Sequence, residues 1–172
     1  MSAICREAES VSSRTQLYNG LQRVAKLPTE TNLSTAIAAV EASLSIAAKA
    51  IICITKTGES GRMLSWHRPR CPILCVTRDP VAARQLNLFW GCIPILYEGK
   101  GADPWSEDVN LRIEYGINYG LQIGLLGDND RVVVVTGWRS EPGHTNTVRI
   151  IQLGSSENHE VIGLPELKRL KY

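Results

Sequence analysis

A hydroxyl-rich turn, TKTGES, is the first feature of the sequence that could do chemistry; it follows the apolar run AIICI and leads into the helix-like GRMLSWHR. Backbone N–H groups at the start of a helix, together with the helix dipole, favour an anion such as phosphate. Thr55, Thr57 and Ser60 add hydroxyl donors, and Gly58 allows the backbone to come close to a ligand. The turn is not a P-loop, because Lys56 lies on the wrong side of the glycine. It is a candidate phosphate cradle, although an ordinary turn with hydroxyl caps explains it equally well.

A second candidate is the segment DPWSEDVNLR, which reads as the start of a helix. Ser106 is placed to cap that helix, and Glu107 and Asp108 carry charges that are favourable in a first helical turn. Arg112 would lie two turns along, and a guanidinium suits a fork-like grip on phosphate. From these residues alone, the stronger interpretation is that Trp105 packs against the start of the helix and Arg112 faces water.

The third candidate is the loop TGWRSEPGHTNT, which follows the apolar run VVVV. Its two glycines, its proline and its hydroxyls indicate a mobile loop, which on its own is simply a connection. In open α/β sheets, however, ligands bind beyond the carboxyl ends of the strands. Three loops at such ends, with Arg112 and Arg139, would together make a site large enough for a ligand with two phosphates.

The strands that must position these loops are indicated by a change in hydrophobic rhythm after residue 50. The runs AIICIT, PILCVT, IPILY and RVVVVTG are short and continuously apolar, which is typical of strands buried on both faces of a parallel sheet covered by helices. The last strand, TNTVRIIQL, follows RVVVVTG after only a short loop, so we expect it to run antiparallel.

Helix-like segments precede and alternate with these strands. They lie at 4–24, 32–50, 61–68, 79–89 and 106–124. In the fourth of them, Asp79 is placed as the cap and Pro80 as the first helical residue. The alternation predicts an α/β domain over residues 1–153, followed by a polar, weakly ordered tail over 154–172.

Composition narrows the class of protein. The 172 residues suffice for one domain, and the 44% hydrophobic and 21% charged content is that of a soluble globular protein. A net charge of +2 argues against nucleic acid or a membrane surface as a general partner. The five cysteines include no zinc-type pair, which favours reduced thiols in a cytoplasmic protein. The three histidines are scattered, so we expect no metal site.

Four motifs resemble a known family. The segments AICREAE, RPRCPILCVTRDPVAARQLNLFWG, WxEDVxLR and TGWR…GxTNT are similar to the C-terminal domain of pyruvate kinase, and the similarity runs from about Ala3 to Leu153. The resemblance implies a mixed five-stranded sheet, mostly parallel with an antiparallel last strand and helices on both faces. It also implies a glycolytic, cytoplasmic enzyme in which this domain binds the allosteric activator fructose 1,6-bisphosphate. The domain would form one interface of a tetramer, with Lys56 and the last strand as candidate contacts.

The resemblance also assigns roles to residues in the three candidate segments. The effector's phosphates would be bound by Thr55, Lys56, Thr57, Gly58, Ser60, Trp105 and Arg112. The 6-phosphate would lie in the TKTGES loop, and the 1-phosphate would lie against the tryptophan and the arginine. The mobile effector loop would comprise Gly137, Trp138, Arg139, Gly143 and Thr145. Where the family commonly has GWRPGSG, this chain has GWRSEPG, so Glu141 brings a negative charge near an anionic ligand.

Catalysis is not expected of these residues alone. In the family, a phosphoryl group moves from phosphoenolpyruvate to ADP in a (β/α)8 barrel with Mg2+ and K+, and neither the barrel nor its catalytic residues match this chain. We therefore expect a C-terminal portion of a pyruvate kinase that is inactive by itself and holds no cofactor. Two alternatives stay open: an assembly module that has lost its effector, and a stand-alone phosphotransferase, which the lack of a metal-binding carboxylate pair near the cradle disfavours.

Overall fold

The computed structural model describes residues 4, 20, 28–99, 101–139 and 141–154. The predicted helix at 4–24 and the predicted tail fall almost wholly outside these residues. The elements are α3 (Thr31–Ser45), β1 (Ala50–Ile54), α4 (Glu59–Trp66), β2 (Ile73–Thr77), α5 (Pro80–Leu86), β3 (Cys92–Leu96), α6 (Trp105–Gln122), β4 (Arg131–Gly137) and β5 (Thr145–Gln152). Strands and helices thus alternate as the sequence predicts.

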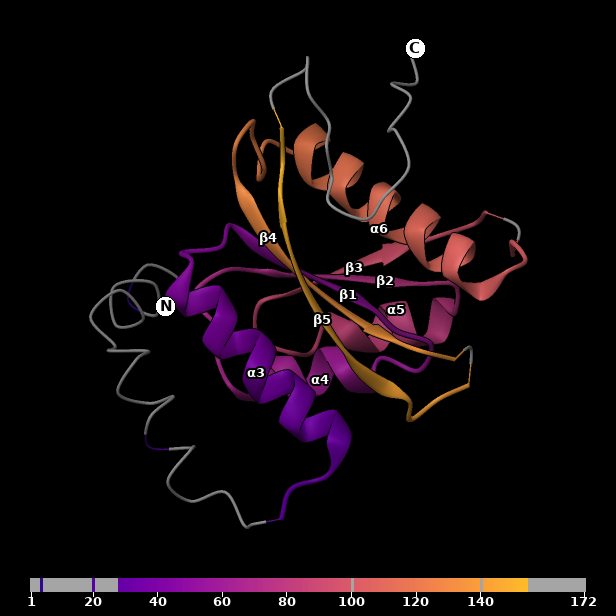
Figure 1. Cartoon of the computed structure of the whole chain (residues 1–172), viewed down its shortest axis with the longest axis horizontal. Helices are drawn as coiled ribbons and strands as arrows, with labels where there is room; N and C mark the ends of the chain where they lie inside the picture. The colour runs from indigo at the N-terminus through magenta and orange to yellow at the C-terminus, as the bar shows by residue number, and fades with distance from the viewer. Residues whose placement is uncertain (1–3, 5–19, 21–27, 100, 140, 155–172) are drawn as a thin grey trace.

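One five-stranded sheet, in the order β3-β2-β1-β4-β5, forms the centre of the molecule (Figure 1). The first four strands of this order are mutually parallel, whereas β5 runs antiparallel to β4. Every residue of β1 and β2 is buried, which explains why their sequences are apolar without alternation. The predicted mixed sheet is confirmed. The two edge strands, β3 and β5, are less buried than the central ones, because each has a neighbouring strand on one side only.

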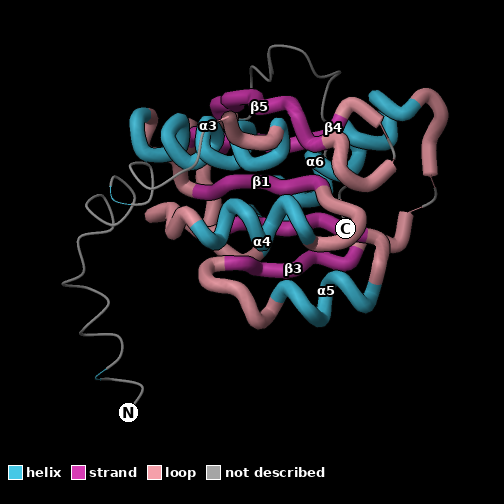
Figure 2. The backbone as a smooth tube through the Cα atoms, turned by 90° about the horizontal axis from the view of Figure 1, so that it is seen from below, coloured by secondary structure: helices cyan, strands magenta, loops and turns pink. Residues whose placement is uncertain are grey.

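Helices cover both faces of the sheet (Figure 2). On one face, residues of α3, α4 and α5 pack against alternate strand residues such as Ile51 and Cys75. On the other face, Val109, Ile113 and Ile117 of α6 pack against the intervening strand residues. Successive side chains of a strand point to opposite faces, so each buried strand contributes to both halves of the core.

The long helix α6 approaches the sheet closely because it carries glycine where a side chain would collide. A Cβ atom on Gly116 would lie 3.1 Å from Val76 Cγ2 and one on Gly120 would lie 3.3 Å from Leu74 Cδ1, both in β2. Glycine inside a helix normally costs about 1 kcal/mol relative to alanine. Here tertiary packing overrides that preference.

The alanine-rich helix α3 is shorter than the sequence predicts. It ends at Ser45, and Ala47 has a φ of 51°, so the predicted helix over 32–50 extends too far. The chain must reverse there to enter β1, and the N–H of Ala48 donates to the carbonyl of Ser43 across that reversal. Alanine's helix preference is therefore overridden by the need to deliver the next strand.

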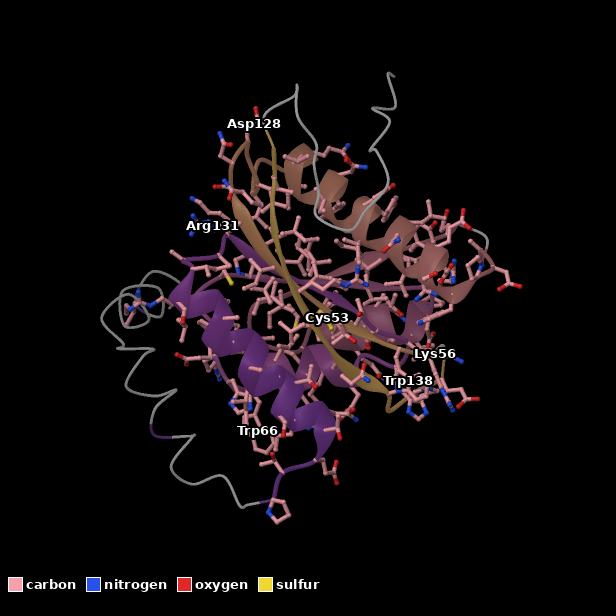
Figure 3. All side chains as sticks on the ribbon, viewed as in Figure 1. Cys53, Lys56, Trp66, Asp128, Arg131 and Trp138 are labelled. Atoms are coloured by element: carbon pink, nitrogen blue, oxygen red, sulfur yellow. The ribbon has the colours of Figure 1, made fainter. Side chains whose placement is uncertain are left out.

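The carboxyl ends of the parallel strands meet at one end of the sheet. Lys56, after β1, and Trp138, after β4, both lie at this end, whereas Asp128 and Arg131 lie at the opposite end (Figure 3). Ligands of open α/β sheets bind at the carboxyl end. The topology therefore brings together the three segments that the sequence singles out.

Candidate functional site

A cavity of about 500 Å³ lies at this end of the sheet. Its lining comes from the turn after β1, the start of α4, the ends of β2 and β4, the region around the start of α6, and the loop before β5. Ten of the twelve residues to which the family resemblance assigns a role line it: Thr55, Lys56, Thr57, Ser60, Trp105, Arg112, Gly137, Arg139, Gly143 and Thr145. Gly58 and Trp138 do not line it. The volume suits a small ligand such as a phosphorylated sugar.

The turn after β1 is stabilised by the side chain of Thr55. The N–H of Gly58 donates to Thr55 Oγ1 at 3.0 Å, and Gly58 has a φ of 84°, which explains the need for glycine. The first helical bond of α4 runs from the N–H of Arg62 to the carbonyl of Gly58. The N–H groups of Glu59 and Ser60 therefore precede the hydrogen-bond ladder at the cavity wall, where an anion is favoured.

Helix α6 begins one residue earlier than the sequence predicts. Pro104 is its N-cap, no side chain caps it, and the carbonyl of Pro104 accepts from the N–H groups of Glu107 and Asp108. The prediction that Ser106 caps the helix is therefore wrong, because a backbone carbonyl already engages these first-turn donors. The acidic first turn itself is confirmed.

Asp108 is the centre of a buried ion cluster. Its carboxylate accepts from Arg78 Nη1 at 3.1 Å and Nη2 at 2.5 Å, and from the N–H of Ala102 at 3.2 Å. Arg112 Nη2 lies 2.7 Å from Asp108 Oδ2. Burial raises the pKa of Asp108, but the hydrogen bonds from Arg78 and Ala102 and the charge of Arg112 together bring it below the ordinary value. Asp108 is thus ionised and holds two guanidinium groups at one wall of the cavity.

Arg112 does not face water, so the stronger interpretation of its segment from local sequence is wrong. It is only 7% exposed, and its guanidinium lies 5.4 Å from the centre of the Trp105 ring. Burial lowers the pKa of Arg112 and the charge of Asp108 opposes that shift. Its Nε is buried without a hydrogen-bond partner among the described residues. An unpaired buried donor is costly to the folded state.

The loop between β4 and β5 forms another wall of the cavity. Its two ends are joined by the N–H of Trp138, which donates to the carbonyl of His144 at 3.4 Å. Arg139 stacks on the Trp138 ring at 3.7 Å, and His144 Nε2 lies 3.5 Å from Glu141 Oε2. Ser60 Oγ and Thr145 Oγ1 are 2.7 Å apart, which links this loop to α4. Hydrogen bonds thus join the two ends of the loop and link the start of β5 to α4 beside the cavity.

Comparison with known proteins places the chain in a family. The family model for the pyruvate kinase alpha/beta domain matches residues 33–151. The chain is 44% identical over 151 residues to "Pyruvate kinase PKLR" of Rattus norvegicus, covering 88% of this chain and 26% of the relative. It is 38% identical over 148 residues to "Pyruvate kinase" of Candida albicans, covering 86% and 29%. The chain belongs to the pyruvate kinase family. It corresponds to the C-terminal domain and spans between a quarter and a third of the length of these relatives.

Sequence reasoning about this pyruvate kinase domain missed part of the cavity wall. Arg78 follows β2 directly, so the rule that ligands bind beyond strand carboxyl ends would have found it. For Asp108, the sequence predicts only a favourable charge in the first turn of a helix. Asn32 of α3 also lines the cavity; with its amide nitrogen toward the loop, it donates to the carbonyls of Gly143 at 3.0 Å and Thr145 at 3.1 Å. No local signal marks Asn32, since its partners lie far away in sequence.

Within the described residues, no group of three or more His, Cys, Asp or Glu side chains is arranged to hold a metal ion. In the same part of the chain, no helix is both long enough and apolar enough to cross a membrane.

Proposed function

We propose that this pyruvate kinase domain is a regulatory domain that binds a phosphorylated sugar in the cavity at the carboxyl end of its sheet. The observation that carries the proposal is the burial and pairing of the Arg112 side chain. This side chain is buried, lines the cavity and is paired with Asp108, and its Nε has no hydrogen-bond partner among the described residues. A charged group in that state gains most from an anionic ligand.

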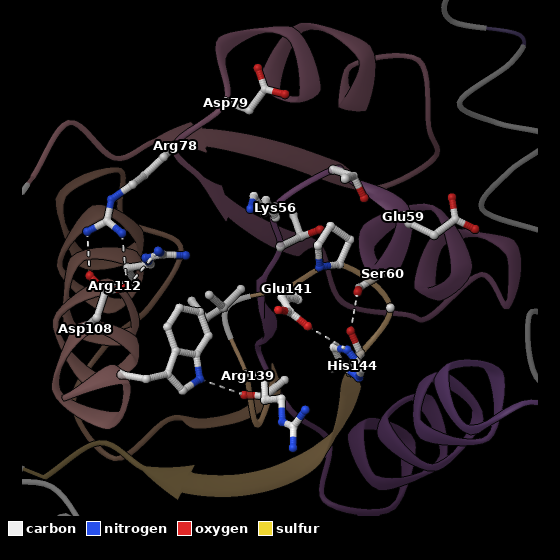
Figure 4. Close-up of a pocket in the computed structure, with 18 of the residues that line it drawn as sticks. Lys56, Glu59, Ser60, Arg78, Asp79, Asp108, Arg112, Arg139, Glu141 and His144 are labelled. Carbon is white, nitrogen blue, oxygen red and sulfur yellow. Dashed lines mark hydrogen bonds and ion pairs between the residues drawn. The ribbon is translucent and has the colours of Figure 1, made fainter. Parts of the chain in front are cut away.

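The cavity offers two regions for such a ligand. Figure 4 shows Arg112 on one side of the cavity and Ser60, at the start of α4, on the other. Trp105 lies against Arg112, and the hydroxyl-bearing Thr57 lies in the turn before α4. Fructose 1,6-bisphosphate, the activator that the family resemblance implies, is the first candidate. Charge-assisted hydrogen bonds contribute about 1.5–3 kcal/mol each, and ordering of the loop before β5 offsets part of that gain. We expect a micromolar dissociation constant, which corresponds to about −8 kcal/mol.

Regulation would reach other subunits through the same loop. The loop leads directly into β5, which is one of the two edge strands of the sheet and carries Ile150 at 55% exposure. An edge strand offers unpaired backbone groups to a second chain. A ligand that fixes the loop would therefore fix the start of a candidate subunit interface. In the whole protein, we expect this to control phosphoryl transfer from phosphoenolpyruvate to ADP in a separate catalytic domain.

A second candidate function is assembly without an effector. Glu141 places a carboxylate in the cavity, and the hydroxyls of Ser60 and Thr145 already bond to each other. Both features work against an anion at that side. A folded chain that self-associates but binds no sugar phosphate would favour this candidate.

The proposal is tested by calorimetric titration of the chain with fructose 1,6-bisphosphate, with tryptophan fluorescence recorded in parallel. We expect saturable binding of about one ligand per chain, and at least a hundredfold weaker binding by Arg112→Ala. Arg131→Ala is the matched control, because this exposed arginine lies at the opposite end of the sheet (Figure 3). Thermal melts establish that each variant is folded. Equal binding by the parent and R112A would contradict the site assignment.

A further inference from the structure

The charges that line the cavity are nearly balanced. The lining residues that the structure describes include the cations Lys56, Arg78, Arg112 and Arg139 and the carboxylates of Glu59, Asp79, Asp108 and Glu141. The two sets are equal in number. Glu59, however, is paired with Arg62, which lies outside the lining, so the other lining charges amount to four cations against three carboxylates. A sugar with two phosphates brings a charge of about −3 to −4 at neutral pH. A cavity with so little net positive charge is poorly matched to two phosphates.

The Arg112 end of the cavity is the part that favours an anion. Arg78 and Arg112 share the single carboxylate of Asp108, so this end keeps a net positive charge. Arg112 Nε is also left without a partner among the described residues. One phosphate can therefore gain charge pairing here.

The Ser60 end is different because a carboxylate lies beside its hydroxyls. Figure 4 shows Glu141 between Arg112 on one side of the cavity and Ser60 on the other, with its carboxylate directed toward His144. The distance from His144 Nε2 to Glu141 Oε2 is 3.5 Å, and that contact is an ion pair only when the imidazole is protonated. Glu141 keeps 70% of its side chain exposed. It is thus a solvated negative charge beside the place where a second phosphate would lie.

We propose that Glu141 makes the cavity select a sugar with one phosphate, held at the Arg112 end, over a sugar with two. The inference rests on the proposed function and names its ligand class. Sugar hydroxyls at the other end donate to the Glu141 carboxylate and exchange hydrogen bonds with Ser60 and Thr145. A second phosphate dianion is repelled by Glu141, which in partly solvated surroundings weakens binding about tenfold.

The test compares three ligands against four forms of the chain. Fructose 1-phosphate, fructose 6-phosphate and fructose 1,6-bisphosphate are titrated at about pH 8, where each phosphate is dianionic. The buffer contains no divalent cation, so that a metal cannot bridge Glu141 and phosphate. The four forms are the parent, Glu141→Gln, Glu141→Lys and the control Glu41→Gln. Glu41 is exposed on α3 and lies outside the cavity lining.

We expect the parent to bind the better monophosphate at least as tightly as the bisphosphate. E141Q should bind the bisphosphate about tenfold more tightly and the monophosphate less than threefold more tightly. E141K should shift the same ratio further, because it replaces the negative charge by a positive one. A purely structural effect of the substitutions would not follow the order of charge. E41Q should leave every constant unchanged.

Two results overturn the inference, and they are distinguishable. If the parent binds the bisphosphate more tightly than both monophosphates, or if the ratio is the same in the parent and both Glu141 variants, selection by Glu141 is wrong while the proposed function stands. If no form binds any of the three sugars, the proposed function fails together with the inference.

Discussion

Two regions of the cavity use the same residue types in opposite surroundings. Near α6, Arg112 lies over Trp105 and is paired with Asp108, and both charged side chains are less than 10% exposed. In the loop before β5, Arg139 lies over Trp138, which is 51% exposed, and Glu141 is 70% exposed. Burial fixes the first set in one geometry, whereas solvent lets the second set rearrange. The comparison indicates a rigid ion cluster on α6 and an adjustable wall opposite it.

The difference also has an electrostatic side. Charges in the buried cluster interact strongly because little water screens them, and breaking such a cluster leaves an uncompensated charge. Contacts between solvated charges are each worth less than about 1 kcal/mol. The α6 region should therefore dominate stability, while the loop should mainly affect ligand choice.

The largest expected effect comes from removing the shared carboxylate. Asp108→Ala leaves Arg78 and Arg112 without their common partner, and Arg112 is then a buried unpaired cation. We expect the free energy of unfolding to fall by about 3–5 kcal/mol. Urea denaturation followed by tryptophan fluorescence measures it. A loss below about 1 kcal/mol would mean that the cluster is not the rigid part of the comparison.

A smaller effect on the free energy of unfolding is expected at low pH. The folded-state pKa of Asp108 lies below its ordinary value of 3.8, so its ionisation stabilises the fold above that pH. This contribution should be lost as the pH falls from about 4 through the folded-state pKa. The measurement is the difference in unfolding free energy between the parent and Asp108→Asn across that window. We expect the difference to shrink with falling pH; a difference independent of pH would contradict the role assigned to this carboxylate.

The smallest effect is expected in the loop. Arg139→Ala removes an exposed cation–π contact with Trp138, which is worth about 0.5–1 kcal/mol. We expect the unfolding free energy to change by no more than that, while the fluorescence of Trp138 shifts. Denaturation curves and emission spectra of the same samples measure both. A loss as large as that of D108A would show that the loop is as rigid as the α6 region, and the contrast between them would disappear.

Much of the fold could be predicted because local sequence carries its signals. Asp79 Oδ1 accepts from the N–H of Val81 at 2.8 Å and Pro80 is the first residue of α5, as the sequence predicts. The unbroken apolar runs indicate buried parallel strands, and the short loop after β4 requires an antiparallel β5. The cradle after β1 is identified from hydroxyls and a glycine that lie within a few residues of each other.

The sequence by itself determined the order of strands and helices, the buried faces and the place of the candidate site. Only the tertiary structure decided what its charges do. It buries Arg112 in an ion pair with Asp108, which also pairs with Arg78. It also brings the hydroxyl of Ser60 into hydrogen-bonding contact with that of Thr145, which lies 85 residues further along the chain. Local patterns report propensity and hydrophobicity, whereas the state of a charge depends on which distant segments exclude water from it. That is why Arg112 reads as a surface residue in the sequence and is a buried cation in the fold.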